Sequence, residues 1–317
     1  MTVLVTGATG FIGPRIVNRL RQAGFGVRIA SRRASLPVAG PLPVAGDAVP
    51  LPAPDAADQA FRDLMRDVSH VVHCAALNND RAAGEAGYRA ANTTLTERLA
   101  KAAAQHASGR FVYLSSIRAV AGPRFSGTVD EATPPAPQCA YGRSKRDGEI
   151  AMLAAYAAAG RDEATALRLP PVYGDGMKGN LAALMRLADS PLPLPDAALT
   201  GVRSLISTEA VADAVLHLVT RPGPLRPAYF AGDATPVAIR AVIAAFRRGF
   251  GRGPRLFPLP APPLGLAATL LGKGASWQAL TATQICDSSL LVSEGWRPQT
   301  DTLDRLAELA RRSAQAR

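Results

Sequence analysis

Lysine is scarce in this chain of 317 residues. Lysine and arginine together number 36, yet only Lys101, Lys145, Lys178 and Lys273 are lysines. Against 25 acidic residues they leave a formal net charge of +11, and a basic surface attracts polyanions whatever the fold. The arginines are spread along the chain without a dense run. We therefore interpret the charge mainly as a compositional bias, with some sites for phosphate-bearing ligands. We expect no nucleic-acid partner; binding of a nucleic acid is the weaker alternative.

Cysteine is also rare, with single residues at Cys74, Cys139 and Cys286 and no C-x-x-C pair. This spacing argues against a disulfide framework and against a zinc site, and it fits a reducing cytoplasm. His70 and His73 lie three residues apart in an expected strand, so their side chains face opposite sides. We therefore expect no metal.

A long uninterrupted apolar run is missing as well. The longest uncharged stretch, residues 256–272, is broken by four prolines, which excludes a good spanning helix. Residues Thr2–Thr6 already have the composition of a strand, and no basic leader precedes them. We expect a cytoplasmic protein with no membrane segment.

Apolar runs bounded by glycine alternate with stretches of helical periodicity, which predicts βαβ units around a parallel sheet. The fold class is therefore α/β, a doubly wound parallel sheet. The expected strands are Thr2–Thr6, Val27–Ala30, Leu42–Ala45, His70–Cys74, Arg110–Ser115 and Ala164–Leu169, and the expected helices are Phe11–Ala23, Ala56–Asp67, Tyr88–His106 and Tyr141–Ala159.

The alternation loosens after Pro170 into shorter elements. We therefore divide the chain into a dinucleotide-binding domain, residues 1–170, and a smaller C-terminal α/β substrate lobe, residues 171–317, with some later segments returning to the first domain. The expected elements of this part are helices at Asn180–Ala188, Thr208–Val219, Pro236–Phe250 and Thr302–Arg312, and a strand at Ala228–Ala231.

The first expected strand runs directly into a turn with glycines at Gly7, Gly10 and Gly13, and a helix follows. Gly7 permits a tight turn, Gly10 lets the backbone approach a pyrophosphate, and Gly13 allows close helix packing. The helix N-terminus adds unpaired N–H groups and a favourable dipole. This junction predicts a dinucleotide site, and a plain turn is the alternative.

The second expected strand ends in Ser31, Arg32 and Arg33, with no carboxylate to accept hydrogen bonds from a ribose 2′-hydroxyl. Either arginine offers a planar fork that matches a 2′-phosphate. We therefore favour NADP(H) over NAD(H) as the cofactor. The alternative is that both arginines are solvated loop residues.

Tyr141 and Lys145 lie four residues apart, hence on one face of an expected helix. A nearby cation favours a phenolate and brings a tyrosine closer to the range useful for acid–base catalysis. About twenty-five residues earlier, a hydrophobic strand ends in Ser115 and Ser116, and the ligands of open parallel sheets bind at the carboxyl ends of strands. We predict that Tyr141 and Lys145 are catalytic and that a serine at this strand end lies beside them; a surface contact of Tyr141 with Lys145 and structural serines are the alternatives.

With these motifs in this order, the sequence resembles the extended short-chain dehydrogenases/reductases of the NAD-dependent epimerase/dehydratase group. The resemblance implies a Rossmann-like fold and a catalytic Ser116, Tyr141 and Lys145, in which Ser116 would hydrogen-bond the reacting oxygen. It also implies an adenine contact from Asp47 after the third strand and a cofactor-side motif at His73–Ala76. The cofactor contacts that it implies are Gly7, Thr9, Gly10, Phe11, Ile12, Gly13, Ser31, Arg32, Arg33, Asp47, Ala75, Ala76, Asn92, Ser115, Tyr141, Lys145, Pro170 and Val172.

The same resemblance implies substrate contacts from Leu77, Ser116, Asn180 and Arg203. The last two would hold the diphosphate of a nucleotide sugar; otherwise Asn180 caps a helix and Arg203 is a surface residue. The second half is similar to bacterial UDP-hexose 4-epimerases and UDP-4-keto-6-deoxy-N-acetylhexosamine 4-reductases. It departs from them in Trp277–Leu280, where relatives usually carry an arginine and this chain has Gln278 and Ala279.

We therefore predict an NAD(P)(H)-dependent oxidoreductase that reduces a 4-keto sugar, or dehydrogenates its alcohol, on a nucleotide sugar. The first alternative is a UDP-hexose 4-epimerase with tightly bound NAD, and the second is a reductase of small non-nucleotide carbonyl compounds. A dinucleotide sensor without chemistry is the least favoured. The resemblance also implies a homodimer, paired through Tyr88–His106 and Tyr141–Ala159.

Overall fold

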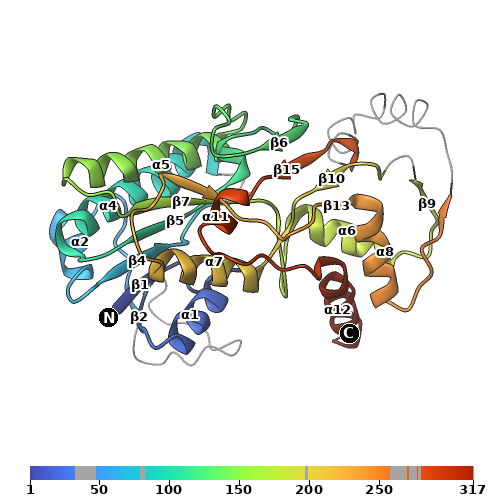
Figure 1. The fold of residues 1–317 in the computed structure, drawn as a ribbon, viewed down its shortest axis with the longest axis horizontal. Helices are drawn as coiled ribbons and strands as arrows, with labels where there is room; N and C mark the ends of the chain where they lie inside the picture. The colour runs from blue at the N-terminus through green and yellow to red at the C-terminus, as the bar shows by residue number, and fades with distance from the viewer. Residues whose placement is uncertain are drawn as a thin grey trace.

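The computed structural model describes residues 1–32, 48–78, 83–196, 199–257, 270, 277 and 280–316. Among these residues, a seven-stranded parallel sheet occupies the larger part of the molecule, at the left of Figure 1. Its strand order is β12-β7-β5-β4-β1-β2-β3. The strands are β1 (Thr2–Thr6), β2 (Gly26–Ser31), β3 (Ala48–Pro50), β4 (His70–His73), β5 (Phe111–Ser116), β7 (Ala164–Leu169) and β12 (Ala228–Phe230).

Helices cover both faces of this sheet (Figure 1). On one face lie α1 (Gly13–Gln22) and α7 (Thr208–Thr220), and on the other lie α2 (Asp58–Leu64), α4 (Leu95–His106) and α5 (Ala140–Ala158). Strand β1 shows why: Val3 and Val5 pack in the core beneath α1 and α7, whereas Leu4 packs in the core beneath α2, α4 and α5. Because successive side chains of a strand face opposite sides, an all-apolar strand needs a helical layer on each.

A smaller lobe lies beside the carboxyl ends of the parallel strands, at the right of Figure 1. Its sheet has the order β13-β10-β15-β6. Helices α6, α8 and α12 enclose a separate apolar core that includes Leu181, Val242, Phe246 and Leu306. The elements are α6 (Gly179–Asp189), α8 (Ile239–Gly249), α12 (Thr302–Gln315), β6 (Gly127–Val129), β10 (Val202–Arg203), β13 (Val237–Ala238) and β15 (Gln284–Cys286).

Several short elements lie outside these two sheets. Strand β8 (Val172–Tyr173) pairs with β11 (Ile206–Ser207), and β9 (Leu194–Pro195) pairs with β14 (Leu256–Phe257). A short helix, α11 (Ser289–Ser293), packs against β12.

The chain passes between the two parts more than once. Strand β6, from the first half of the sequence, pairs with β15 in the smaller lobe, while β12 and α7 return to the large sheet. We keep the division at residue 170 as a proposal for where the substrate lobe begins, with residues 208–230 assigned to the larger part.

Five of the expected strands of the first domain agree with β1, β2, β4, β5 and β7 within one or two residues. The expected strand Leu42–Ala45 lies outside the described residues. Asp47 was expected after the third strand, yet the strand that pairs with β2 begins at Ala48, so Asp47 precedes it. The expected helix Pro236–Phe250 begins only at Ile239, because Val237 and Ala238 pair with β10.

The long helix expected over Tyr88–His106 is interrupted. It is built from α3 (Gly84–Tyr88), a π-helical stretch at Arg89–Thr94, and α4. A π-helical turn widens the helix by one residue and is frequent at functional sites. Here it carries the buried Asn92.

Candidate active site

The glycine turn at the end of β1 is packed as tightly as its sequence requires. Gly7 has φ +69°, and a Cβ there would lie 2.5 Å from the backbone nitrogen of Ala75. A Cβ on Gly13 would meet the Gly7 carbonyl and would lie 2.5 Å from Cα of Ala8. Any larger residue would therefore push the turn away from β4 or α1 away from the turn.

The outer side of the same turn is open. Thr9 and Gly10 are exposed, and Phe11 and Ile12 are half-buried. A Cβ on Gly10 would approach only the Gly7 carbonyl, at 3.1 Å. Helix α1 begins at Gly13, and within the described residues no side chain caps its N-terminus. Exposed backbone at an uncapped helix start suits a phosphate group, which is what a dinucleotide would place there.

His73 anchors the segment that leaves β4 beside this turn. It is fully buried, and its two ring nitrogens lie 2.6 Å from Thr6 Oγ1 and 3.0 Å from Thr96 Oγ1. Burial, and secondarily the charge of Lys145, lowers the pKa of His73 to about 3. Thr6 Oγ1 also accepts a hydrogen bond from the Ala75 N–H at 3.2 Å. The histidine is thus a neutral structural group that helps to hold the backbone of residues 74–77 against β1.

Asn92 has its polar groups committed to the protein. Its Oδ1 accepts from the Leu77 N–H at 2.8 Å, and its Nδ2 donates to the Leu77 carbonyl and to Ser144 Oγ, both at 3.0 Å. The side chain is fully buried. The cofactor contact that the resemblance implies for Asn92 stays a prediction. In the structure, its hydrogen bonds hold the loop after β4 against α5.

The two serines at the end of β5 face different ways. Ser115 is buried and donates to Glu149 Oε1 at 2.6 Å, so its hydroxyl points into the protein rather than toward a cofactor. Ser116 is half-buried, accepts from the Arg118 N–H at 3.2 Å, and is hydrogen bonded to the phenol of Tyr141. The structure therefore joins Ser116 to Tyr141 and separates Ser115 from them.

Tyr141 lies in the first turn of α5, with its ring edge-on to Tyr88 at a centroid distance of 6.2 Å. Burial raises its pKa to about 12, although the hydrogen bond from Ser116 and the charge of Arg118 both lower it. The phenol is therefore protonated near neutral pH, which suits a proton donor.

Lys145 is not the cation beside the phenol that the four-residue spacing predicted. Its ammonium donates to the Leu114 carbonyl at 2.7 Å and lies 4.3 Å from the centre of the Tyr113 ring. The side chain is buried, and burial lowers its pKa to about 7 in spite of Cys74 and Glu149. In this structure the charge that lowers the pKa of Tyr141 belongs to Arg118.

Glu149, one turn after Lys145, is a residue that the sequence reasoning missed. It is fully buried and accepts from Ser115, from Arg146 Nη1 at 2.9 Å, and from Arg168 Nη2 at 2.8 Å. It thereby joins α5 to β5 and β7, through the serine that precedes Ser116. Its position at i+4 from Lys145 on the same helix was the available clue.

The remaining predicted residues are spread around the same edge of the sheet. Ser31 is buried, Arg32 is exposed at the end of β2, and Arg33 and Asp47 lie outside the described residues. Ala75, Ala76 and Leu77 are half-buried in the loop after β4. Pro170 directly follows β7, and Val172 is the first residue of β8.

The two predicted diphosphate residues differ in exposure. Asn180 is exposed at the second position of α6, and the capping position is Lys178, so Asn180 is not the N-cap. Arg203 is 8% exposed in β10 and donates to the Ala282 carbonyl, so it is not a surface residue. Gln278 and Ala279 lie outside the described residues.

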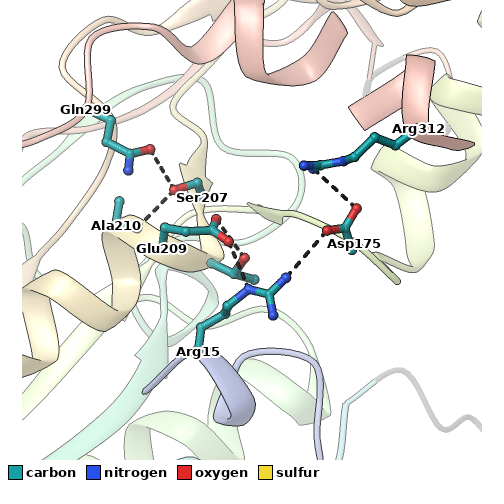
Figure 2. A network of polar contacts seen from close by, with 8 residues as sticks. Arg15, Asp175, Ser207, Glu209, Ala210, Gln299 and Arg312 are labelled. Atoms are coloured by element: carbon teal, nitrogen blue, oxygen red, sulfur yellow. Dashed lines mark hydrogen bonds and ion pairs between the residues drawn. The ribbon is translucent and has the colours of Figure 1, made fainter. Parts of the chain in front are cut away.

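An ionic network links helix α1 to the smaller lobe (Figure 2). Arg15, in the first turn of α1, pairs with Glu209 at 2.9 Å and with Asp175 at 3.4 Å, and Asp175 also pairs with Arg312 of α12 at 3.3 Å. Ser207 caps α7 beside them by accepting from the Ala210 N–H. Helix α1 is thus tied to both α7 and α12.

No group of three or more His, Cys, Asp or Glu side chains in the described ranges is arranged to hold a metal ion. Likewise, within the part of the chain that the structure describes, none of the helices is both long and apolar enough to cross a membrane.

Comparison with known proteins adds to this geometry. The model of the NAD dependent epimerase/dehydratase family matches residues 3–229. A UDP-glucose 4-epimerase of Vibrio cholerae is 29% identical over 99% of this chain and 96% of its own length. A ceramide reductase of Caulobacter vibrioides is 30% identical over 89% of this chain and 80% of its own. Among solved structures, MoeE5 in complex with UDP-glucuronic acid and NAD superposes with a TM-score of 0.74 at 26% identity, over 99% of this chain and 100% of that one.

Proposed function

The chain belongs to the NAD dependent epimerase/dehydratase family, and on that premise we propose that it transfers hydride at C4 of the sugar in a nucleotide sugar. It is a nicotinamide-dependent enzyme of the extended short-chain dehydrogenase/reductase type. One observation carries the proposal: the hydrogen bond between Ser116 and Tyr141 lies at the carboxyl end of β5, on the edge of the sheet that also bears the open glycine turn. Ligands of open parallel sheets bind at this edge.

Tyr141 moves the proton in this proposal. Its pKa of about 12 keeps the phenol protonated near neutral pH, so it is ready to donate to the oxygen of a ketone as the carbonyl carbon gains hydride. Ser116 is placed to donate to the same oxygen and to orient it. In the oxidative direction Tyr141 takes the proton back, and the charge of Arg118 stabilises the phenolate.

The residues of the glycine turn fit a nicotinamide dinucleotide. Gly10 exposes its backbone, and α1 presents an uncapped N-terminus for the pyrophosphate. Bound there, the dinucleotide would supply or accept the hydride at C4 of its nicotinamide ring. Lys145 is buried between β5 and α5, where its hydrogen bond to the Leu114 carbonyl fixes β5 relative to Tyr141.

The net reaction that we favour is NADP(H)-dependent reduction of a 4-keto sugar, or the reverse dehydrogenation. The support is that Arg32 is exposed at the end of β2 and that no carboxylate follows this strand up to Arg33. A guanidinium at this place suits a 2′-phosphate. An enzyme that exchanges its cofactor after each turnover is a reductase or dehydrogenase rather than an epimerase.

A UDP-hexose 4-epimerase with retained NAD is the second candidate. It is favoured by the similarity to the Vibrio cholerae relative, which extends over nearly the whole of both chains, and by the NAD in the MoeE5 complex. A third candidate is reduction of a carbonyl compound that carries no nucleotide, and the similarity to the Caulobacter ceramide reductase favours it.

Purified protein incubated with a panel of UDP-, GDP- and dTDP-linked sugars tests the proposal. We expect absorbance at 340 nm to follow stoichiometric NADPH consumption with a 4-keto substrate. Conversion of UDP-glucose to UDP-galactose without added cofactor would favour the epimerase. Turnover of ketones that carry no nucleotide, with none of the nucleotide sugars, would favour the third candidate.

Tyr141→Phe tests the assignment of the proton donor. We expect turnover to fall by about a hundredfold to ten-thousandfold while the affinity for the dinucleotide stays unchanged. Tyr156→Phe is the matched control, because Tyr156 lies on the same helix and its buried hydroxyl makes no hydrogen bond within the described residues. Equal turnover by Tyr141→Phe and wild-type protein would refute the mechanism.

Pairing of two copies through residues 88–106 and 141–159 stays a prediction. It is supported by Ile150, which is 49% exposed on α5, and by the packing of α4 against α5. Gel filtration with light scattering would determine the oligomeric state.

A further inference from the structure

Arg118 is fixed at the centre of the candidate active site by its main chain. It lies in a short 3-10 turn, Ile117–Ala119, directly after β5, and its N–H donates to Ser116 Oγ at 3.2 Å. Its carbonyl packs so closely on the first turn of α5 that a Cβ on Gly142 would overlap with it. The main chain of Arg118 therefore contacts both Ser116 and Gly142, the residue that follows Tyr141.

The side chain of Arg118 extends from there toward the smaller lobe. Its Nη2 donates to Gln284 Oε1 at 3.0 Å, and its Nη1 approaches the Ala121 carbonyl at 3.4 Å. Gln284 belongs to β15 and is the register partner of Arg203 in β10. The guanidinium of Arg118 thus contacts β15 of the smaller lobe beside the strand that carries Arg203, and its charge also acts on Tyr141.

The amide of Gln284 is held in the orientation that this contact needs. Its Nε2 donates to the Phe125 carbonyl at 2.9 Å and to the Pro123 carbonyl at 3.1 Å. Because the nitrogen is occupied, the oxygen faces Arg118 and directs the guanidinium without neutralising it.

No carboxylate among the described residues forms an ion pair with Arg118. Arg168 shows the contrast: it is also buried near β5, and Glu149 neutralises it through two hydrogen bonds. Arg118 has instead a second cation nearby, since burial and the charge of Arg118 lower the pKa of Arg203 to about 10. A like charge and partial desolvation both disfavour a charged guanidinium, and an anion bound beside Arg118 would offset them.

We propose that Arg118, together with Arg203, binds an anionic group of the substrate beside Tyr141. This rests on the proposed function and deepens it. The chemistry is an oxyanion with several oxygens, which a planar guanidinium binds through paired hydrogen bonds. Two groups that a nucleotide sugar can carry have this chemistry: the diphosphate, and a carboxylate on the sugar ring.

Calorimetric titration of UDP, UDP-glucose and UDP-glucuronate into the cofactor-loaded protein tests the site. Hydrogen bonds to charged groups contribute enough that we expect Arg118→Gln to weaken binding by about tenfold to a hundredfold. Arg118→Lys keeps the positive charge but loses the planar guanidinium. Its affinity for these ligands should therefore lie between those of wild-type protein and Arg118→Gln. Arg66→Gln is the control, because its side chain is 75% exposed and its ion pair is with Asp63, three residues earlier. Dinucleotide affinity and melting temperature, measured for each variant, show that the variant is folded.

The three ligands separate the two sources of the anion. An equal loss for all three ligands assigns Arg118 to the diphosphate, and a loss for UDP-glucuronate alone assigns it to a sugar carboxylate. Unchanged affinity of Arg118→Gln for all three, with wild-type protein binding them, overturns the site and leaves the proposed function standing. Failure of the wild-type protein to bind any of them overturns the nucleotide-sugar assignment itself and the site with it. If Arg118→Gln does not fold, the same criteria apply to Arg118→Lys.

Discussion

Glu149 and Arg168 form a two-point ion pair in the interior, with Nε to Oε1 at 3.0 Å and Nη2 to Oε2 at 2.8 Å. The pair joins α5 to β7, and the bond from Ser115 to Glu149 adds β5. Because α5 also carries Tyr141 and Lys145, the distance between the phenol and Ser116 depends on this buried pair. Glu149 is therefore a positioning residue for the proposed chemistry.

Glu149→Gln should destabilise the protein strongly. It leaves the buried guanidinium of Arg168 without a counter-charge, and breaking one side of a buried pair costs about 3–5 kcal/mol. Glu97→Gln is the matched control, since Glu97 pairs with Lys101 at i+4 on an exposed face and such a pair contributes about 1 kcal/mol or less. Urea unfolding of both variants gives the comparison, and equal losses would contradict the role given to Glu149.

Lys145 predicts a pH dependence of stability. Burial lowers its pKa to about 7, whereas in the unfolded chain it titrates near 10.4. Between these values the unfolded chain binds more protons than the folded one, so stability rises with pH across this window, by up to about 1.4 kcal/mol per unit.

Lys145→Met removes this titration. The free energy of unfolding of wild-type protein should therefore gain on that of Lys145→Met as the pH rises from 7 to about 10, and below pH 7 the difference should be constant. Chemical denaturation of both proteins over this range provides the measurement. Parallel profiles throughout would mean that Lys145 keeps an ordinary pKa in the folded state.

Gly13→Ala should disturb the glycine turn through packing alone. The new methyl group would meet the Gly7 carbonyl and Cα of Ala8, both main-chain atoms, and overpacking of this kind costs about 1–3 kcal/mol. We also expect weaker binding of NAD(P)H, followed by its fluorescence. Gly253→Ala is the control, because a Cβ there meets nothing within 4 Å. An unchanged melting temperature and dinucleotide affinity for Gly13→Ala would show that the turn has room to relax.

The network around Arg15 should be sensitive to salt. Its bonds to Glu209 and Asp175 are partly exposed, so Arg15→Gln is expected to cost about 1 kcal/mol or less at low ionic strength. In 1 M NaCl, where the Debye length is about 3 Å, most of that difference should disappear. Thermal unfolding at 0.05 M and 1 M NaCl measures it, and a difference that persists in high salt would point to lost packing instead.

Ser116 and Tyr141, the residues that we propose as catalytic, could be identified from the sequence because each lies in a local pattern with a known geometry. A strand that ends in Ser116 must end at the ligand-binding edge of a parallel sheet, and Tyr141 must begin the next long helix. The directions of the neighbouring side chains were not accessible in the same way. Ser115 stays a predicted cofactor contact, but the sequence did not indicate that alternation along the strand turns its hydroxyl inward to Glu149.

Contacts of charged groups between residues far apart in the chain were the second feature that could not be predicted from the sequence. The four-residue spacing of Tyr141 and Lys145 predicted that the ammonium would act on the phenol, yet the Leu114 carbonyl, thirty-one residues away in sequence, takes the ammonium. Arg118 carried no motif at all. Its position beside Tyr141 depends on Gln284, which lies 166 residues further along the chain.

The sequence by itself determined the alternating strands and helices, the glycine turn, and the places of Ser116 and Tyr141, because these follow from periodicity and spacing over a few residues. Only the tertiary structure decided which charges are neutralised, which hydroxyls face the site, and how the smaller lobe meets the larger one. Those outcomes depend on burial and on pairs of residues far apart in the chain, as Glu149 with Arg168 and Arg118 with Arg203 show.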